Sequence, residues 1–265
     1  MKFHKIREIS DLHNEFDVFT IPPMDGDNET TLVLAGDIDL SKRSALITFL
    51  KVASEQFRDV VYIFGNHEYY KTSYVNAIKY VKKELELESI YNVHILQDSS
   101  IVIDNVAFIG ATLWTSFDDG NPLTLLNAKS TMNDYKHIRS GVTDNPYFRN
   151  LTPTEIYASF LKSKDFIFAE CKKMKMAGHK VVVITHHAPS FMSVTENFRG
   201  SPDNGLYCSN LDNNILDTQP DIWFHGHMHQ TISYSIENTN VYTNPRGYHP
   251  SQLNPLFNPN FLIEI

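Results

Sequence analysis

The sequence contains only two cysteines, Cys171 and Cys208, and neither belongs to a Cys-x-x-Cys pair. Two such cysteines do not make a disulfide framework, so we expect reduced thiols and a cytoplasmic protein. The N-terminal residues lack the apolar segment of a secretory signal. No apolar run elsewhere approaches the length that crosses a membrane, so no membrane partner is expected.

Basic residues are also scarce. The chain has 23 Lys and Arg against 31 Asp and Glu, a formal net charge of -8, and a pI of about 5.8. An acidic chain lacks general attraction to phosphate backbones, which argues against nucleic acid as a partner. Apolar residues make up 42% of the 265 residues, with 17 Phe and 13 Tyr, which excludes a disordered chain. This length predicts one domain over residues 1–265.

Short apolar runs alternate with helical stretches along the first half of the chain, and hairpin patterns follow. Helices are expected at about 73–87 and after Thr152, where Thr as the cap, Pro153 and Glu155 form a helix start. The pattern indicates a mixed α/β protein whose sheet faces are covered. Strands or hairpins are expected at 31–35, 60–64, 93–114, 181–184, 222–224 and 232–243.

Two stretches, roughly 115–151 and 188–219, show no clear periodicity and are predicted to be long loops. Each follows soon after a strand that ends near polar residues. Structureless segments of this length are uncommon inside compact domains and are often functional. The loops are therefore expected to border a binding site.

The histidines are abundant and clustered. Seven of the twelve fall in four short groups at or near the ends of apolar runs, together with Asp and Asn. Strand ends at one edge of an α/β sheet converge, so these groups are expected to meet in one crevice. The polar clusters are Asp11-x-His13, Gly36-Asp37, Gly65-Asn66-His67-Glu68, His186-His187 and Gly226-His227-x-His229.

These residue types suit the hydrolysis of a phosphate ester. Two cations about 3.5–4 Å apart can clamp the attacking and the leaving oxygen and generate hydroxide near neutral pH. A carboxylate can bridge two cations, while imidazole and carboxamide groups complete the shells without adding charge. Nitrogen and oxygen ligands without thiolate favour Mn, Fe, Zn, Co or Ni.

The order of the motifs resembles that of the calcineurin-like metallophosphoesterase superfamily, and the likeness covers nearly the whole chain. The resemblance implies a four-layer α/β/β/α sandwich, in which two packed mixed sheets are flanked by helices. The motifs that carry it are Ser10-Asp11-Leu12-His13, Leu34-Ala35-Gly36-Asp37, Gly65-Asn66-His67-Glu68, Thr185-His186-His187-Ala188-Pro189, Gly226-His227-Met228-His229 and Asn244-Pro245-Arg246-Gly247-Tyr248.

The same resemblance implies a role for each matching residue. A bridging hydroxide would attack the phosphorus, and His67 would bind no metal but protonate the leaving oxygen or steady the transition-state charge. Asp37 would bridge the two metal ions and is thus also counted with the catalytic residues. The implied ligands are Asp11, His13 and His229 for one metal ion, and Asn66, His186 and His227 for the other.

Several residues are left open by the sequence. His186 directly follows its strand and is preferred as the ligand over His187. Many family members carry an acidic residue three positions after the bridging Asp, whereas here Asp39 follows Asp37 by two. Glu68 is expected to orient His67 or a backbone turn. His225, Asn133, Asp134, Trp114 and Arg246 could lie near the site, or could be ordinary buried, capping or surface residues.

The leading hypothesis is a phosphoesterase acting on a small-molecule mono- or diester, with a cyclic nucleotide also possible chemically. Two alternatives differ from it. An inactive member of this fold would keep a protein-binding surface without metal, and a nuclease would carry a basic strip beside the metals.

Overall fold

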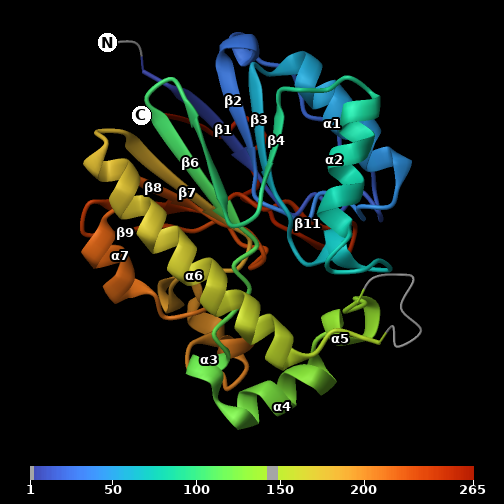
Figure 1. The fold of residues 1–265 in the computed structure, drawn as a ribbon, viewed down its shortest axis with the longest axis vertical. Coiled ribbons are helices and arrows are strands. Elements are labelled where there is room, and N and C mark those ends of the chain that lie inside the picture. Colours follow the sequence, from blue (N-terminus) through green and yellow to red (C-terminus); the bar gives the residue numbers. More distant parts are fainter. Residues whose placement is uncertain (1–2, 142–148) are drawn as a thin grey trace.

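Two β-sheets lie at the centre of the computed structural model, which describes residues 3–141 and 149–265 (Figure 1). The first sheet contains β1 (Lys5–Ile9), β2 (Thr30–Leu34), β3 (Asp59–Ile63), β4 (Val93–Leu96) and β13 (Leu262–Glu264). The second contains β5 (Ser99–Ile103), β6 (Val106–Ala111), β7 (Lys180–Thr185), β8 (Ile222–Phe224), β9 (Ser233–Ile236) and β10 (Thr239–Tyr242). A separate short ribbon is formed by β11 (Gly247–Tyr248) and β12 (Gln252–Leu253).

Both sheets are mixed. The first has the order β13-β1-β2-β3-β4, with parallel pairing except between β13 and β1. The second has the order β5-β6-β7-β8-β10-β9, and its two outer pairs are antiparallel. Because β1, β2 and β3 are parallel, and β7 and β8 are parallel, the carboxyl ends within each group lie at one sheet edge.

Apolar side chains fill three layers around these sheets. The inner layer joins the sheets through residues such as Val33, Val61, Val182 and Phe224, all fully buried. Helices α1 (Ser44–Gln56) and α2 (Ala77–Leu87) cover the outer face of the first sheet. Helices α6 (Pro153–Met176) and α7 (Asp212–Thr218) cover the second (Figure 1). The predicted arrangement of two packed mixed sheets flanked by helices is confirmed.

The predicted start of α6 is confirmed in detail. The Thr152 side chain accepts a hydrogen bond from the Glu155 backbone, and the Glu155 carboxylate accepts one from the Thr152 backbone. Hairpins β5–β6 and β9–β10 also lie where the sequence predicts them, turning at Asp104 and Glu237 with left-handed backbone. No helix among the described residues is both long and apolar enough to cross a membrane.

The stretches predicted as long loops contain short helices. The first carries α3 (Phe117–Gly120), α4 (Pro122–Thr131) and α5 (Asp134–His137), while residues 142–148 lie outside the described part. The second carries three single turns of 3-10 helix, at Phe191–Ser193, Glu196–Phe198 and Asn204–Leu206, before α7. Helix α4 buries the small residues Thr124 and Ala128 and exposes Leu123 and Leu126, so it has no apolar stripe to reveal it.

Candidate metal centre

The seven predicted metal ligands lie just beyond the carboxyl ends of five strands from both sheets. Parallel pairing aligns the strand ends within each sheet, and the packing of the two sheets against each other brings the two sets of ends together. Asp11 and His13 follow β1, Asp37 follows β2, Asn66 follows β3, His186 follows β7, and His227 and His229 follow β8.

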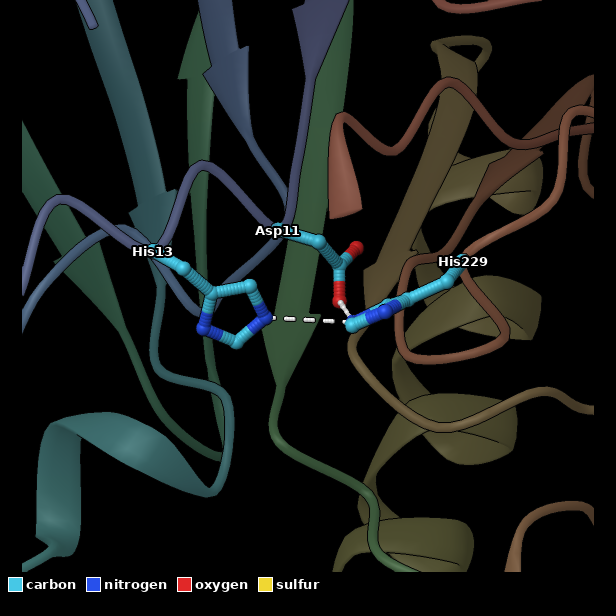
Figure 2. Close-up of side chains that lie close together, drawn as sticks. All are labelled: Asp11, His13 and His229. Atoms are coloured by element: carbon cyan, nitrogen blue, oxygen red, sulfur yellow. Dashed lines mark hydrogen bonds and ion pairs between the residues drawn. The ribbon is translucent and has the colours of Figure 1, made fainter. Parts of the chain in front are cut away.

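Three of them, Asp11, His13 and His229, form the first group (Figure 2). The Nε2 atoms of His13 and His229 face each other at 3.1 Å. The His229 Nε2 atom also lies 3.3 Å from Asp11 Oδ1. Figure 2 shows both imidazoles and the carboxylate pointing toward one space from three sides. Their ligand atoms fall within 4.8 Å of one another, which is close enough to share one cation.

A second group consists of Asp37, His186 and His227, with Asn66 beside it. The His186 Nε2 atom lies 3.3 Å from Asp37 Oδ2 and 3.1 Å from Asn66 Oδ1. Asp37 Oδ2 is also 3.8 Å from His13 Nε2, so one carboxylate oxygen faces both groups. Asp37 therefore lies at the junction between the two groups.

The backbone at these positions is strained. Five of the seven residues have φ between 49° and 67°, a left-handed conformation that side chains other than glycine seldom adopt. Each such residue costs on the order of 1–3 kcal/mol, and such strain clusters at functional sites. The residues are Asp11, His13, Asp37, His227 and His229.

Glycines allow the strand ends to approach one another. A Cβ atom on Gly65 would collide with Asp37 Oδ1 and would lie 2.7 Å from His186 Cε1. One on Gly226 would lie 2.5 Å from Asp11 Oδ2. At both places a glycine is required by the close packing of predicted ligands rather than by a turn alone.

The buried Glu68 carboxylate ties two of the strand ends together. Its Oε2 atom accepts hydrogen bonds from the backbone N–H groups of Asp37 and Gly65, at 3.0 and 2.8 Å. Its Oε1 atom accepts from the Ile38 N–H and the Tyr62 hydroxyl, both at 2.7 Å. As expected, Glu68 orients a backbone turn, and in doing so it fixes Asp37 against Gly65.

Asp37 and His186 stabilise each other's charged forms. Burial disfavours protonation of His186, but the Asp37 carboxylate outweighs it and raises the pKa of His186 to about 10. Burial would likewise raise the pKa of Asp37, yet the imidazoles of His186 and His67 hold it well below its usual value. The negative charge of Asp37 that holds a proton on His186 would also attract a metal cation.

The donor set fits metal cations. Within the described part of the chain, His227 Nε2 is buried and has no hydrogen-bond partner, so it is available as a ligand in the second group. His186 donates from Nδ1 to the Ala35 carbonyl at 2.9 Å, which leaves Nε2 available as a ligand. All donors are nitrogen or oxygen, a combination suited to Mn, Fe, Zn, Co or Ni.

His67 lies beside the first group but faces other partners. Its Nδ1 is 2.7 Å from Glu15 Oε1, and its Nε2 is 3.1 Å from the Tyr248 hydroxyl. Its ring stacks on Tyr70 with centroids 4.3 Å apart. Burial lowers the pKa of His67, but the charges of Asp37 and Glu15 raise it to about 9.

Glu15, Tyr70 and Tyr248 were missed as site residues from the sequence. Glu15 repeats the two-residue spacing of Asp11-x-His13, which is the one signal that could have revealed it. Burial would raise the pKa of Glu15, whereas hydrogen bonds from His13 and His67 lower it to about 2. Tyr248 is brought to the site by the β11–β12 ribbon.

The residues left open by the sequence have definite places. His187 lies between the rings of Trp114 and His227 and does not face Asp37 as His186 does. His225 is buried and contacts the Ser193 hydroxyl at 2.8 Å. Arg246 binds the loop after β1. It donates hydrogen bonds to the Leu12 and Asp17 carbonyls and pairs with the Asp17 carboxylate at 2.5 Å.

A cleft of about 1520 Å³ opens over the two groups. Asn133 and Asp134 line it, together with exposed apolar side chains such as Phe16 and Phe198, while Trp114 is buried in the core. The cleft is larger than the roughly 300–1,000 Å³ usual for small-molecule sites. The predicted loops border it, as both contribute lining residues.

Comparison with known proteins identifies the family to which this chain belongs. The sequence pattern of the calcineurin-like phosphoesterases matches residues 4–231, and the chain belongs to that family. The predicted resemblance is confirmed. Uncharacterized protein L509 of Acanthamoeba polyphaga mimivirus is 26% identical over 286 residues, covering 98% of this chain and 96% of its own. The crystal structure of phosphopantetheinyl hydrolase (PptH) from Mycobacterium tuberculosis shares the fold, with a TM-score of 0.69 and 14% identity over 99% of this chain and 96% of that one.

Proposed function

We propose that this protein hydrolyses a phosphate mono- or diester at a pair of metal cations. The observation that carries the proposal is the position of Asp37 Oδ2, which faces His186 at 3.3 Å and His13 at 3.8 Å. One carboxylate between two separate ligand groups is the arrangement that a binuclear centre requires. Asp11, His13 and His229 would hold one cation, and Asn66, His186 and His227 the other, with Asp37 shared.

Different residues of the chain would bind the cations and donate the proton to the leaving oxygen. Bound cations would supply activation of a water molecule for attack and neutralisation of the phosphate charge. His67 would protonate the departing oxygen from Nε2, the ring nitrogen that faces the Tyr248 hydroxyl. Tyr70 stacks on the face of the His67 ring and would keep Nε2 turned in this direction.

The substrate we propose is a small organic phosphate ester. Among the described residues that line the cleft, apolar side chains are combined with only two Lys or Arg residues, Arg43 and Lys71. A nuclease would need a denser row of cations to follow a nucleic-acid backbone. The fold shared with phosphopantetheinyl hydrolase makes a phosphopantetheinyl ester a reasonable member of the test panel.

The test is metal analysis coupled to hydrolysis. Purified protein should bind two equivalents of Mn²⁺ or Zn²⁺ and hydrolyse a chromogenic monoester or diester. Asp37→Ala should lose both bound metal and rate. His67→Ala should keep the metal and lose most of the rate, on the order of 10²–10⁴-fold.

Two outcomes would contradict the proposal. Absence of hydrolysis with Mn, Ni, Co or Zn, together with absence of bound metal, would favour a protein-binding member of the fold. Loss of metal from His67→Ala would instead overturn the separation between ligands and proton donor.

A further inference from the structure

Glu15 contacts two histidines that have different proposed tasks. Its Oε1 atom is 3.1 Å from Nδ1 of His13 and 2.7 Å from Nδ1 of His67. The carboxylate is nearly buried, with 7% of the side chain exposed. The two imidazoles lie close to each other in an edge-on arrangement, with ring centroids 4.5 Å apart. A single oxygen thus joins a metal-group histidine to the histidine proposed as proton donor.

This contact determines which nitrogen of each ring is free. A carboxylate accepts from an N–H group, so both Nδ1 atoms carry their proton toward Glu15. The Nε2 atom of His13 is then free to face the first ligand group, 3.1 Å from His229 Nε2. The Nε2 atom of His67 faces the Tyr248 hydroxyl. Each ring is therefore turned with Nε2 toward its proposed task.

Asp39, the other nearby acid, contacts Leu40 and Arg43 through its Oδ1 atom. Its Oδ1 atom accepts a hydrogen bond from the Leu40 backbone at 2.7 Å and pairs with Arg43 at 3.1 Å. No interaction between Asp39 and His67 is found among the described residues. The structure offers Glu15 and not Asp39 as the carboxylate that supports His67.

We propose that Glu15 is a positioning residue that acts through both histidines, setting His13 for cation binding and His67 for protonation of the leaving oxygen. The inference rests on the proposed phosphoesterase function. Its distinctive feature is the sharing of one oxygen, which couples the two tasks. Carboxylate partners of metal-bound histidines typically contribute 10–100-fold to affinity or activity.

The first experiment compares two phosphate esters that differ in how much they need a proton donor. Nitrophenolate leaves readily without protonation, whereas a simple alkoxide needs it. Glu15→Gln keeps one acceptor oxygen but introduces an NH₂ group that cannot accept from either ring, which weakens the hold on the two Nδ1–H groups. This variant should lower kcat for the alkyl ester by about 10²-fold and kcat for the nitrophenyl ester less than tenfold. KM should change little for either ester.

The second experiment does not depend on activity. Glu15→Ala removes the acceptor from both rings and should weaken Zn²⁺ binding by 10–100-fold in a titration. Ring-nitrogen NMR of the Zn²⁺-loaded wild type should show His13 and His67 protonated at Nδ1, and Glu15→Ala should lose this preference. Because the wild-type spectrum needs no variant, the proposal stays testable if a variant fails to fold.

Two control variants distinguish the positioning role of Glu15 from a nonspecific effect of substitution. Glu55→Gln makes the same chemical change at an exposed position of α1. It should change neither kcat for the two esters nor the affinity for Zn²⁺. Asp39→Asn removes the other acid and should leave the ratio between the two esters unchanged.

The outcomes are distinct. If the wild type hydrolyses both esters but Glu15→Gln slows them equally, or leaves both unchanged, the positioning role is overturned. If wild-type His13 or His67 is protonated at Nε2 instead, it is overturned regardless of rate. If the wild type hydrolyses neither ester, the proposed function fails, while the spectra still decide whether Glu15 orients the two rings.

Discussion

Replacing Glu68 by glutamine should destabilise the fold far more than its conservative chemistry suggests. The buried carboxylate accepts four hydrogen bonds, from the backbones of Asp37, Ile38 and Gly65 and from the Tyr62 hydroxyl. The amide of Glu68→Gln can accept only through its oxygen, and its NH₂ group would face two N–H or O–H donors. Both donors would then be buried without an acceptor.

The magnitude follows from that count. Each buried donor without an acceptor costs about 1–3 kcal/mol, so we expect the free energy of unfolding to fall by about 4 kcal/mol. For a chain of this size that corresponds to a Tm lower by roughly 10 °C. Tyr62→Phe removes a single donor and should cost only about 1 kcal/mol.

Chemical denaturation of the three proteins in the presence of a chelator would measure these values apart from metal binding. Glu55→Gln, which changes an exposed glutamate, serves as the matched control and should stay near the wild type. A Glu68→Gln protein within 1 kcal/mol of the wild type would refute the reasoning, because the four contacts would then carry no net stability.

Three further predictions concern the centre and its frame. Gly65→Ala should lose the bound cation and at least about 2 kcal/mol of stability, since its Cβ would overlap the Asp37 carboxylate; intact metal content by elemental analysis would contradict this. Thr152→Ala removes the helix cap that accepts from Glu155 and should cost about 1 kcal/mol in urea unfolding while leaving hydrolysis unchanged. Chelation should lower the Tm, and added Mn²⁺ or Zn²⁺ should raise it with concentration, because cations bind the folded state in preference to the unfolded one; a Tm independent of metal in calorimetry would argue against a metal centre.

The sequence was most informative where local chemistry dictates structure. The strands at 31–35 and 60–64 are apolar runs followed by glycine, the run at 181–184 is followed by Thr185 and His186, and the structure places β2, β3 and β7 there. The capping signal at Thr152 likewise depends on residues three positions apart. The fold class followed from such elements together with the family resemblance. The cytoplasmic location and the single-domain organisation stay predictions.

Other features depend on contacts that no local pattern encodes. Strand β1 contains Arg7 and Glu8, which are fully buried, so no continuous apolar run marks this interior strand in the sequence. Arg7 is tolerated there because it pairs with Asp27 at 3.0 Å and donates to the Pro259 carbonyl. The part played by Glu15 required knowledge of where His67 lies, 52 residues further on. Tertiary pairing, not propensity, decides such positions.

The pairing of β13 with β1 joins two segments that lie far apart in the sequence. Residues 5–7 align with residues 262–264, and Ile265 exchanges backbone hydrogen bonds with His4. During synthesis, the strand that leads into Asp11 therefore acquires its outer neighbour only after residues 262–264 emerge from the ribosome. Such a long-range closure is slow compared with local folding. A chain interrupted before residue 262 would carry all seven proposed ligands and still leave the edge of β1 open to pairing with other chains.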